Sequence, residues 1–530
     1  MRFTRDSIAS ASNTALPRKP TRGFRCYWLN TQRPIVTTAR GTPRLTSAMP
    51  DVDETNATED ASASSAGAQS YRATEARDAP ASTVGARTVG EVKDALGWST
   101  YQWRLFCITG LCIMAEGIEV NLLSFLEIEC QKEWGLSEKR TGDIASGVFA
   151  GEIAGCVLFG LLADMYGRKP AFGLGIVLVT VFGVLSAFSR SVEEMILYGF
   201  GLGLGIGGFS VPYDLLCEFC PNSARGVVMM ALWTWWTLGS FMVLQLASVT
   251  LATQGWRMMC VYCAIPPIVS TLGLIWVDES PTWLLVKGHK KEAEAIFTRA
   301  AKTNRIDIGE VELVEEKEHP LDVRLLFKGD NALRTILVWV TCFAQTFLYY
   351  GTVLYLPRVF LVLMTDGRDA SLADDDVEYP YWALCASIGG ELLGNILAMT
   401  LVQRYARSSL TAFFFALYAV AFPIIIAPVS DVVMVIAAMA SRLSASIAGN
   451  MTWLIAPEAY PTEVRATGHS WANMLARLGA FATTHWVTST QDTQVLFAGY
   501  SVVAIVAAFA AAALPPGQMP GSTISKLKDA

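Results

Sequence analysis

The chain has 530 residues, of which 52% are hydrophobic and 17% charged, with a net charge of −6 at pH 7 and a mean hydropathy of +0.37. Because soluble domains carry about 25% charged residues, this composition argues against a soluble globular protein. The sequence has no basic, aromatic-interleaved patch typical of nucleic-acid binding. It also has no metal-ligand cluster, catalytic triad or phosphate loop, so it predicts neither an enzyme nor a bound metal or cofactor.

Residues 1–87 are predicted to form a disordered tail. Within this tail, residues 1–48 contain nine Arg or Lys and one acidic residue, a composition typical of an organelle transit peptide. Alternatively, Met49 is the true start of the protein and opens an acidic tail. Both interpretations stay open, so the sequence allows the plasma membrane or an organelle, a plastid included.

Beyond residue 100, apolar runs of helix length follow one another with short polar breaks. Each run is long enough to cross ~30 Å of hydrocarbon as a helix. The predicted fold class is therefore an all-α membrane protein with twelve transmembrane helices in the lipid bilayer. The runs cover residues 104–126, 143–163, 171–189, 195–217, 226–251, 258–277, 333–356, 380–402, 409–429, 431–455, 466–489 and 494–514.

Arg and Lys in the short loops predict the orientation, because cytoplasmic loops are enriched in these residues. Basic residues follow the second, fourth, eighth and tenth runs, and many more lie in the connection 278–332. We expect that connection, with its short helices, and both termini to be cytoplasmic. The acidic loop 366–378 is expected on the opposite side.

The two halves of the chain share motifs at a nearly constant offset. GEIAG around Glu152 recurs as GELLG around Glu391, 239 residues later, and EFCPNSARG (218–226) recurs as EAYPTEVRATG (458–468), 240 residues later. Such a repeat is typical of transporters built from two six-helix halves, whose substrate site lies between the halves near the midplane.

The repeated E-x-x-P-x-x-x-R motif follows the fourth and tenth runs. Proline ends a helix, so the Glu and the Arg of each copy are expected to face each other across a short cytoplasmic loop. We interpret Glu218 with Arg225, and Glu458 with Arg465, as gate pairs that form in one state and separate in another. Ordinary loop charge is the alternative interpretation.

The segment GLLADMYGRK (160–169) resembles the signature between helices 2 and 3 of the major facilitator superfamily. In that superfamily this loop stabilises the outward-facing state, so the resemblance implies that Asp164 and Arg168 belong to the cytoplasmic gate. Gly160 and Gly167 are expected to allow a close backbone approach and a tight turn.

Three further motifs resemble particular branches of this superfamily. TVGEVKDALGWSTYQWRLF (88–106) resembles the start of helix 1 in the synaptic-vesicle-related transporters and the nicotinate carriers. DESPTWLL (278–285) and PEAYPTEVRATG (457–468) resemble motifs that the sugar and organic-ion carriers share. The resemblance implies two pseudo-symmetric six-helix bundles. Their expected bounds are 88–277 and 333–515, with a C-terminal tail at 516–530.

The sequence departs from these families at several motif positions. Gln403 and Ala406 replace the acid and the glycine in the second copy of the loop signature, and Thr282 stands where an arginine is usual. Gly199 occupies the place of an arginine at the start of helix 4. These departures weaken the expected gate and any mechanism that needs a basic residue in helix 4.

Helices 1, 4, 7 and 10 line the central cavity in this superfamily, and here they carry charged and aromatic residues. The implied substrate- and proton-binding residues are Glu116, Glu119, Arg442, Asp214, Tyr349 and Tyr350. The two tyrosines adjoin a glycine, where a planar substrate can stack. Asp214 can instead belong to the gate.

Glu116 and Glu119 are three residues apart and share one helical face. Burial and mutual repulsion disfavour two ionised carboxylates at one site, so one of the two can hold a proton near neutral pH. Arg442 would oppose this protonation if it lies close. A finely balanced acid of this kind is what a proton-coupled carrier needs.

Three more ionisable residues lie inside predicted helices, namely Glu152, Glu391 and Arg477. Intramembrane charges usually face the bundle interior and pair, so these residues are candidates for function. The alternative for the two glutamates is polar helix packing, and for the arginine a structural pair.

The sequence thus predicts a secondary active transporter of a small organic ion, coupled to protons and functional as a monomer. Arg442 suits a carboxylate such as nicotinate, whereas the Glu116 and Glu119 pair suits an organic cation. Symport and facilitated diffusion both stay open. The alternative is a non-transporting membrane receptor or scaffold that keeps the carrier fold.

Overall fold

The computed structural model describes residues 86–314, 323–364, 379–460, 465–490 and 492–514. The predicted transit peptide, the acidic loop 366–378 and the C-terminal tail 516–530 therefore lie outside the described residues. So does nearly all of the predicted N-terminal tail.

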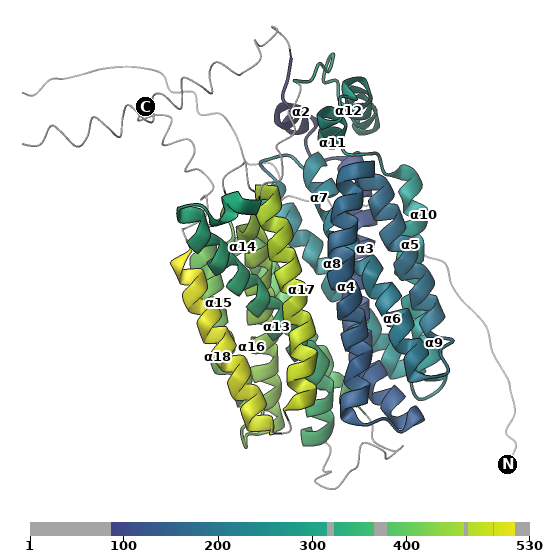
Figure 1. Cartoon of the computed structure of the whole chain (residues 1–530), viewed down its shortest axis with the longest axis vertical. Coiled ribbons are helices and arrows are strands. Elements are labelled where there is room, and N and C mark those ends of the chain that lie inside the picture. The colour runs from purple at the N-terminus through teal and green to yellow at the C-terminus, as the bar shows by residue number, and fades with distance from the viewer. Residues whose placement is uncertain (1–85, 315–322, 365–378, 461–464, 491, 515–530) are drawn as a thin grey trace, which may run out of the picture. The chain divides into compact units, whose positions relative to one another are not determined.

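The described residues are almost entirely helical (Figure 1). The first half comprises α2 (Val89–Leu96), α3 (Thr100–Trp134), α4 (Glu138–Tyr166), α5 (Arg168–Ser186), α6 (Val192–Ile206), η1 (Gly207–Phe209), α7 (Ser210–Phe219), α8 (Arg225–Thr250), α9 (Gly255–Cys263), α10 (Ile265–Gly273) and η2 (Leu274–Trp276). The connection holds α11 (Pro281–Val286), α12 (Lys290–Asn304) and η3 (Val323–Phe327). The second half comprises α13 (Asp330–Met364), α14 (Tyr381–Leu401), α15 (Arg407–Ile424), α16 (Asp431–Glu458), α17 (Arg465–Ser489) and α18 (Thr493–Ala513).

Eleven helical segments in the described part of the chain are long and apolar enough to cross a membrane. The fourth is formed by α6, η1 and α7, and the sixth by α9, α10 and η2. The helix α17 has 25 residues, long enough to span, but it is more polar than the others. With α17 the structure is consistent with the twelve predicted spans, and the all-α membrane fold class is confirmed.

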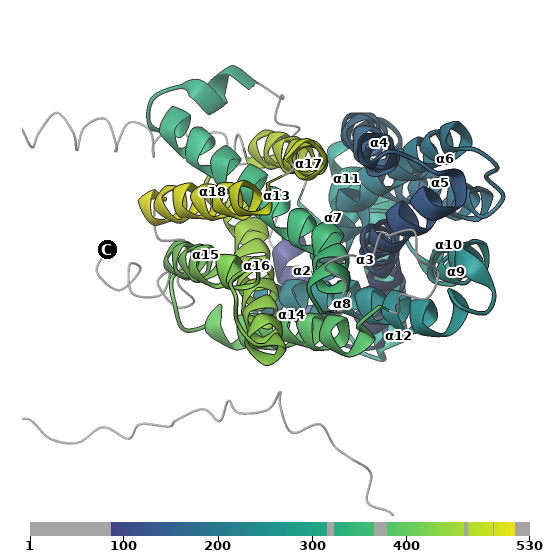
Figure 2. The same ribbon diagram turned by 90° about the horizontal axis from the view of Figure 1, so that it is seen from below.

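The spanning helices form two bundles, α3–α10 and α13–α18, which Figure 2 shows end-on. Helix contacts within the bundles are led by α4 with α6 in the first and by α15 with α16 in the second. Between the bundles, α4 contacts α17, α8 contacts α14 and α3 contacts α13. These three helix pairs join the two bundles.

The helices α4 and α6 approach each other closely because glycines lie at their contact. A Cβ atom at Gly151 would clash with the backbone of Phe200, and one at Gly203 would clash with the carbonyl of Val148. Small residues are what allow membrane helices to pack backbone against backbone. This contact fixes the rotation of α4 and with it the direction of Glu152, which reaches α17.

The two glycines of the loop signature behave differently. Gly167 adopts a φ of 107° at the turn between α4 and α5, as the motif predicts, because residues with a Cβ rarely adopt that conformation. A Cβ atom at Gly160 would meet no atom within 4 Å. The close backbone approach that the motif predicts at Gly160 is therefore not observed.

The helices α2, α11 and α12 cover one end of the α3–α10 bundle, which we call the loop end (Figure 1). The backbone N–H of Tyr101 donates to Asn304 Oδ1 (2.8 Å), which ties α3 to α12. The backbone N–H of Asn222 donates to Asp94 Oδ1 (2.7 Å), which ties the turn before α8 to α2. The loop end is thus braced by the connection between the bundles.

A cavity between the two bundles

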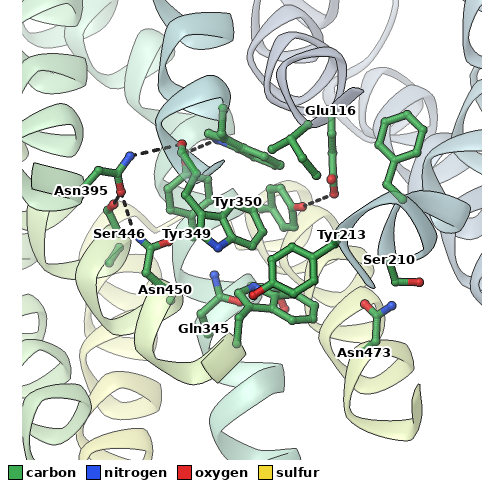
Figure 3. Close-up of a pocket in the computed structure, with 18 of the residues that line it drawn as sticks. Glu116, Ser210, Tyr213, Gln345, Tyr349, Tyr350, Asn395, Ser446, Asn450 and Asn473 are labelled. Carbon is green, nitrogen blue, oxygen red and sulfur yellow. Dashed lines mark hydrogen bonds between the residues drawn. The ribbon is translucent and has the colours of Figure 1, made fainter. Parts of the chain in front are cut away.

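A cavity of about 780 Å³, its open mouth included, lies between the bundles (Figure 3). It reaches from the middle of the helices toward the loop end, and α3, α7, α8, α13, α14, α16 and α17 contribute to its wall. Seven Phe, Tyr or Trp residues line it, namely Phe209, Tyr213, Trp233, Trp236, Tyr349, Tyr350 and Trp453. Its polar lining includes Glu116, Gln345, Glu391, Asn395, Ser446, Asn450, Asn473 and Arg477.

Arg477 bridges the two bundles by contacting two carboxylates. Its Nη1 donates to Glu116 Oε1 at 2.5 Å and to Glu152 Oε2 at 2.8 Å. The Tyr350 hydroxyl lies 3.3 Å from the same nitrogen and 3.5 Å from Glu116 Oε1. We call Glu116, Glu152 and Arg477 the triad. It joins α3 and α4 of one bundle to α17 of the other.

The triad is almost completely buried and holds more acid than base. Its three residues are at most 5% exposed. Ionised groups at such depth persist only when they are paired, and one guanidinium faces two carboxylates here. Glu152 Oε1 and Arg477 Nε have no hydrogen-bond partner. The triad is therefore neither electrically balanced nor fully hydrogen-bonded when both acids are ionised.

A second charged cluster surrounds Glu391 on α14. Arg442 donates to Glu391 Oε2 through Nη2 (2.7 Å) and Nε (3.2 Å), and the Tyr349 hydroxyl donates to the same oxygen (2.8 Å). Across the bundle interface, the Thr237 hydroxyl donates to Oε1 (2.7 Å). One arginine and one carboxylate balance each other, so this cluster is neutral.

A row of amides extends the second cluster along the cavity wall (Figure 3). Asn395 donates to Thr237 Oγ1 (2.8 Å), and its own oxygen accepts from Ser446 (2.6 Å) and Asn450 (2.7 Å). Because Thr237 lies in the first bundle and the other residues in the second, this row also crosses the interface. Relative motion of the bundles must break these bonds.

The structure does not bring Glu116, Glu119 and Arg442 together as the sequence suggests. Glu119 lines a separate, mostly apolar cavity inside the α3–α10 bundle, beside Gly199. No hydrogen bond or ion pair joins it to another described residue. Arg442 pairs with Glu391, and Arg477 takes the position beside Glu116. Glu116 and Glu119 are three residues apart on α3, but their side chains differ in direction and face different neighbours.

Asp214 is not among the residues that line the cavity. It is half-buried on α7, and the charged groups that act on it are His469, Arg168 and Arg225. Its surroundings match the gate alternative for this residue. Tyr349 and Tyr350, by contrast, line the cavity and contact the two charged clusters.

The loop between α4 and α5 docks onto the segment that precedes α11. Asp164 and Arg168 form an ion pair of 2.7 Å. Glu279 Oε1 accepts from the backbone N–H groups of Arg168 (2.7 Å) and Lys169 (3.1 Å), and Trp283 Nε1 donates to the Asp164 carbonyl (3.0 Å). A carboxylate at a helix N-terminus satisfies free donors and the helix dipole.

Replacing Glu279 with alanine is expected to lower the free energy of unfolding by about 1–2 kcal/mol, because two N–H groups at the start of α5 lose their acceptor. Thermal unfolding of the purified protein in detergent measures the change. Glu310→Ala, at an exposed position after α12, is the matched control and should leave the midpoint unchanged. Equal midpoints for the two variants would contradict the capping role.

The predicted pair of Glu218 with Arg225 is not observed. Glu218 accepts a hydrogen bond from the Ser280 hydroxyl, and Thr282 also donates to it. The side chain of Arg225 is directed to Cys217 instead. The reason is that the DESPTW segment (278–283) lies next to the end of α7. Its hydroxyl groups, instead of the arginine, are hydrogen-bonded to the Glu218 carboxylate.

In the second half, Glu458 forms an ion pair with Arg407 at the start of α15. Its predicted partner, Arg465, begins α17, but that side chain lies outside the described residues. The observed pair joins α15 and α16 within one bundle.

The sequence did not single out Gln345 and Asn395, which line the cavity, or Thr237, which is hydrogen-bonded to Glu391 and Asn395. Asn395 lies four residues after Glu391, and Asn450 lies four after Ser446, so each pair shares a helical face. This spacing is the feature of the sequence that could have indicated Asn395 and Asn450 as members of the site. Trp453 also lines the cavity, eleven residues after Arg442, because the wall extends over several turns toward the loop end.

Two six-helix bundles around a charged cavity define a membrane transporter of the major facilitator class. The chain belongs to the sugar (and other) transporter family, whose profile matches residues 116–514. It is thus a multi-pass integral membrane protein and a transporter, not an enzyme.

Several relatives are similar over most of the chain. Synaptic vesicle 2-related protein of Xenopus laevis is 27% identical over 436 residues, which cover 79% of each chain. Organic cation/carnitine transporter 7 of Arabidopsis thaliana is 28% identical over 431 residues, 74% of this chain and 86% of that protein. Niacin transporter NiaP of Acinetobacter baylyi is 27% identical over 418 residues, 77% of this chain and 92% of that protein.

Solved structures of the xylose transporter XylE share the fold. The proton:xylose symporter XylE bound to 6-bromo-6-deoxy-D-glucose has a TM-score of 0.61 at 21% identity, over 77% of this chain and 94% of XylE. The inward-open conformation of XylE from E. coli has a TM-score of 0.61 at 18% identity, over 81% and 99%. At these identities the likeness concerns the fold alone.

Proposed function

We propose that this protein is a secondary active transporter that moves a small organic ion by alternating access and couples this movement to protons. The observation that carries the proposal is the triad, in which two carboxylates of one bundle meet one arginine of the other beside a cavity. The names of the plant and bacterial relatives support an organic ion as substrate, either an organic cation or a carboxylate such as niacin.

The triad supports proton coupling because its charge is unbalanced. With Glu116 and Glu152 both ionised, it carries one net negative charge on residues that are almost completely buried, which is costly. One proton on either carboxyl restores neutrality. Proton binding and release at this site therefore change the stability of the contact between the bundles.

The contacts between the bundles support a state that is open toward the loop end. On the opposite side of the cavity, the hydroxyls of Ser146 and Thr484 lie 3.0 Å apart, and Tyr379 donates to Glu129 Oε1 (3.0 Å). In the proposed cycle these contacts open when the loop end closes. With the loop end and both termini cytoplasmic, as the loop charges favour, this is the inward-facing state.

Uptake into proteoliposomes with an imposed pH gradient tests the function. We expect the wild-type protein to accumulate at least one organic ion, about tenfold per pH unit if one proton is exchanged or cotransported per ion. Glu116→Gln should abolish the dependence on the gradient, whereas Glu292→Gln, exposed on α12, should retain it. Absence of flux for ions of both signs, with folded protein, would support a receptor or scaffold instead.

A disulfide across the side opposite the loop end is expected to stop transport. Ser146 and Thr484 lie on α4 and α17 with their hydroxyls in contact, so cysteines at both positions should cross-link under oxidation and hold that side shut. Uptake by the double variant should fall to a few per cent of wild type and recover on reduction. Each single cysteine variant is the control. Full activity of the cross-linked protein would contradict the alternating-access proposal.

A further inference from the structure

We propose that the transported ion is an organic cation and that it exchanges for the proton held by the triad. This inference rests on the proposed function and specifies its substrate class and its direction of coupling. It follows from the charge count at the site, from the absence of an arginine or lysine along the described cavity wall that is not paired with a carboxylate, and from the aromatic lining.

The charge count leaves one negative charge for a ligand to neutralise. The triad contributes two carboxylates and one guanidinium, and the Glu391–Arg442 pair is balanced. Glu119 contacts no cation in the described chain and lies in an apolar cavity, where an ionised carboxylate is costly, so we count it as neutral. The site as a whole is one positive charge short of neutrality.

The groups that face the triad from neighbouring helices do not supply that charge. They are Tyr349 and Tyr350 of α13, Cys112 and Glu119 of α3, and Cys156 of α4. None of these side chains can carry a positive charge. Neutrality therefore requires a mobile positive charge, which is either a proton or a cationic substrate.

No arginine at the site offers an anionic substrate an uncompensated positive charge. Arg442 is hydrogen-bonded to Glu391 through two nitrogens, and Nη1 of Arg477 is shared by two carboxylates. Among the described lining residues, His469 is the only other basic side chain, and it lies at the loop end of the wall. A bound carboxylate would thus add a further negative charge to a site whose arginines are already compensated.

A cation finds three indole rings and two free acceptors. Trp233 lies 6.1 Å from both Trp236 and Trp453, measured between ring centroids, so the rings form a continuous aromatic wall. Faces of tryptophan attract cations, and desolvation strengthens that attraction. Gln345 Oε1 and Asn473 Oδ1, both on lining residues, have no partner and can accept hydrogen bonds from an ammonium group.

The same charge count makes the exchange obligatory. The site is neutral with a proton and no substrate, and neutral again with a monovalent cation and no proton. With neither it carries one negative charge, and with both it carries one positive charge. Because an uncompensated charge in a closed, water-poor site is costly, only the two neutral forms pass through the occluded state. One cation therefore crosses the membrane for each proton that crosses in the opposite direction.

Proteoliposomes loaded with a pH-sensitive dye test this exchange. The probes are N-methylnicotinamide, which is a cation, nicotinate, which is an anion of similar ring size, and tetraethylammonium. We expect an acidic interior to drive uptake of one or both cations, with alkalinisation of the interior as protons leave. We expect no nicotinate uptake under either direction of the gradient.

Nicotinate uptake driven by an acidic exterior would overturn the inference while it upholds the proposed function. Cation uptake accompanied by acidification of the interior would also overturn the inference, because it would indicate symport. Absence of flux for all three probes, with protein that is folded by its thermal unfolding, would count against both proposals.

Substitution of Glu152 tests the proton exchange most directly. In Glu152→Gln the site is neutral without a proton, so bound cation leaves it positively charged, and we expect cation uptake to fall at least tenfold and proton counterflow to disappear. Glu152→Asp keeps the charge and should restore counterflow, which separates charge from folding. Glu292→Gln is the matched control at an exposed position. Normal proton counterflow in Glu152→Gln would overturn the inference.

Discussion

Replacing Arg477 with methionine is expected to abolish transport and to lower the free energy of unfolding by about 3–5 kcal/mol, the usual effect of leaving a buried charge without its partner. The reason is that Glu116 and Glu152 then face each other with no cation among the described neighbours. Thermal unfolding in detergent and uptake into proteoliposomes measure the two effects separately.

The control for Arg477→Met is a triple variant that also carries Glu116→Gln and Glu152→Gln. This variant removes the whole triad, so its stability should return to within about 1–2 kcal/mol of wild type, as expected when a buried ionic cluster is replaced by neutral groups of similar size. Transport should stay absent. If the single variant is as stable as wild type, the triad does not hold the charges that the structure assigns to it.

Replacing Gly203 with valine is expected to lower the free energy of unfolding by about 3 kcal/mol or more, at the upper end of overpacking effects. The added side chain must displace the Val148 carbonyl of α4, so the helix pair has to separate. Folded yield and thermal unfolding measure the loss.

The matched control for this prediction is Gly160→Val on α4, where the added atoms enter open space and stability should stay within about 0.5 kcal/mol of wild type. Equal effects of the two substitutions would mean that helix propensity, and not the α4–α6 contact, decides stability.

Most of the fold follows from hydropathy and internal repetition. Apolar runs of spanning length predict the helices, and the two copies of the E-x-x-P-x-x-x-R motif predict two related halves. The helix α17 shows the limit of hydropathy alone, because His469 and Arg477 reduce its apolar character. Both residues line the cavity. The polar side chains of the site therefore lower the hydropathy by which this helix is recognised in the sequence.

The site was predicted in its residue types more than in its pairs. Glu116, Glu152, Arg477, Glu391 and Arg442 were all recognisable as ionisable residues inside spans. Which arginine meets which acid depends on helix rotation and on the docking of the two bundles, and neither is encoded in local spacing.

The aromatic wall and the free amide oxygens depend on the same tertiary arrangement. Trp233 and Trp453 lie on different bundles and more than two hundred residues apart in sequence. In a membrane protein, tryptophan more often marks an interface with the headgroups, so composition favours that interpretation. Their stacking is visible only in the assembled structure.

The most direct test counts protons when a ligand binds. Calorimetric titration of the purified protein with the cation that it transports, repeated in buffers of different ionisation enthalpy, yields the number of protons released per cation bound. We predict a value near one for wild type at a pH where the empty site is protonated, and near zero for Glu152→Gln. Release of no protons by the wild type, or uptake of a proton on binding, would contradict the account.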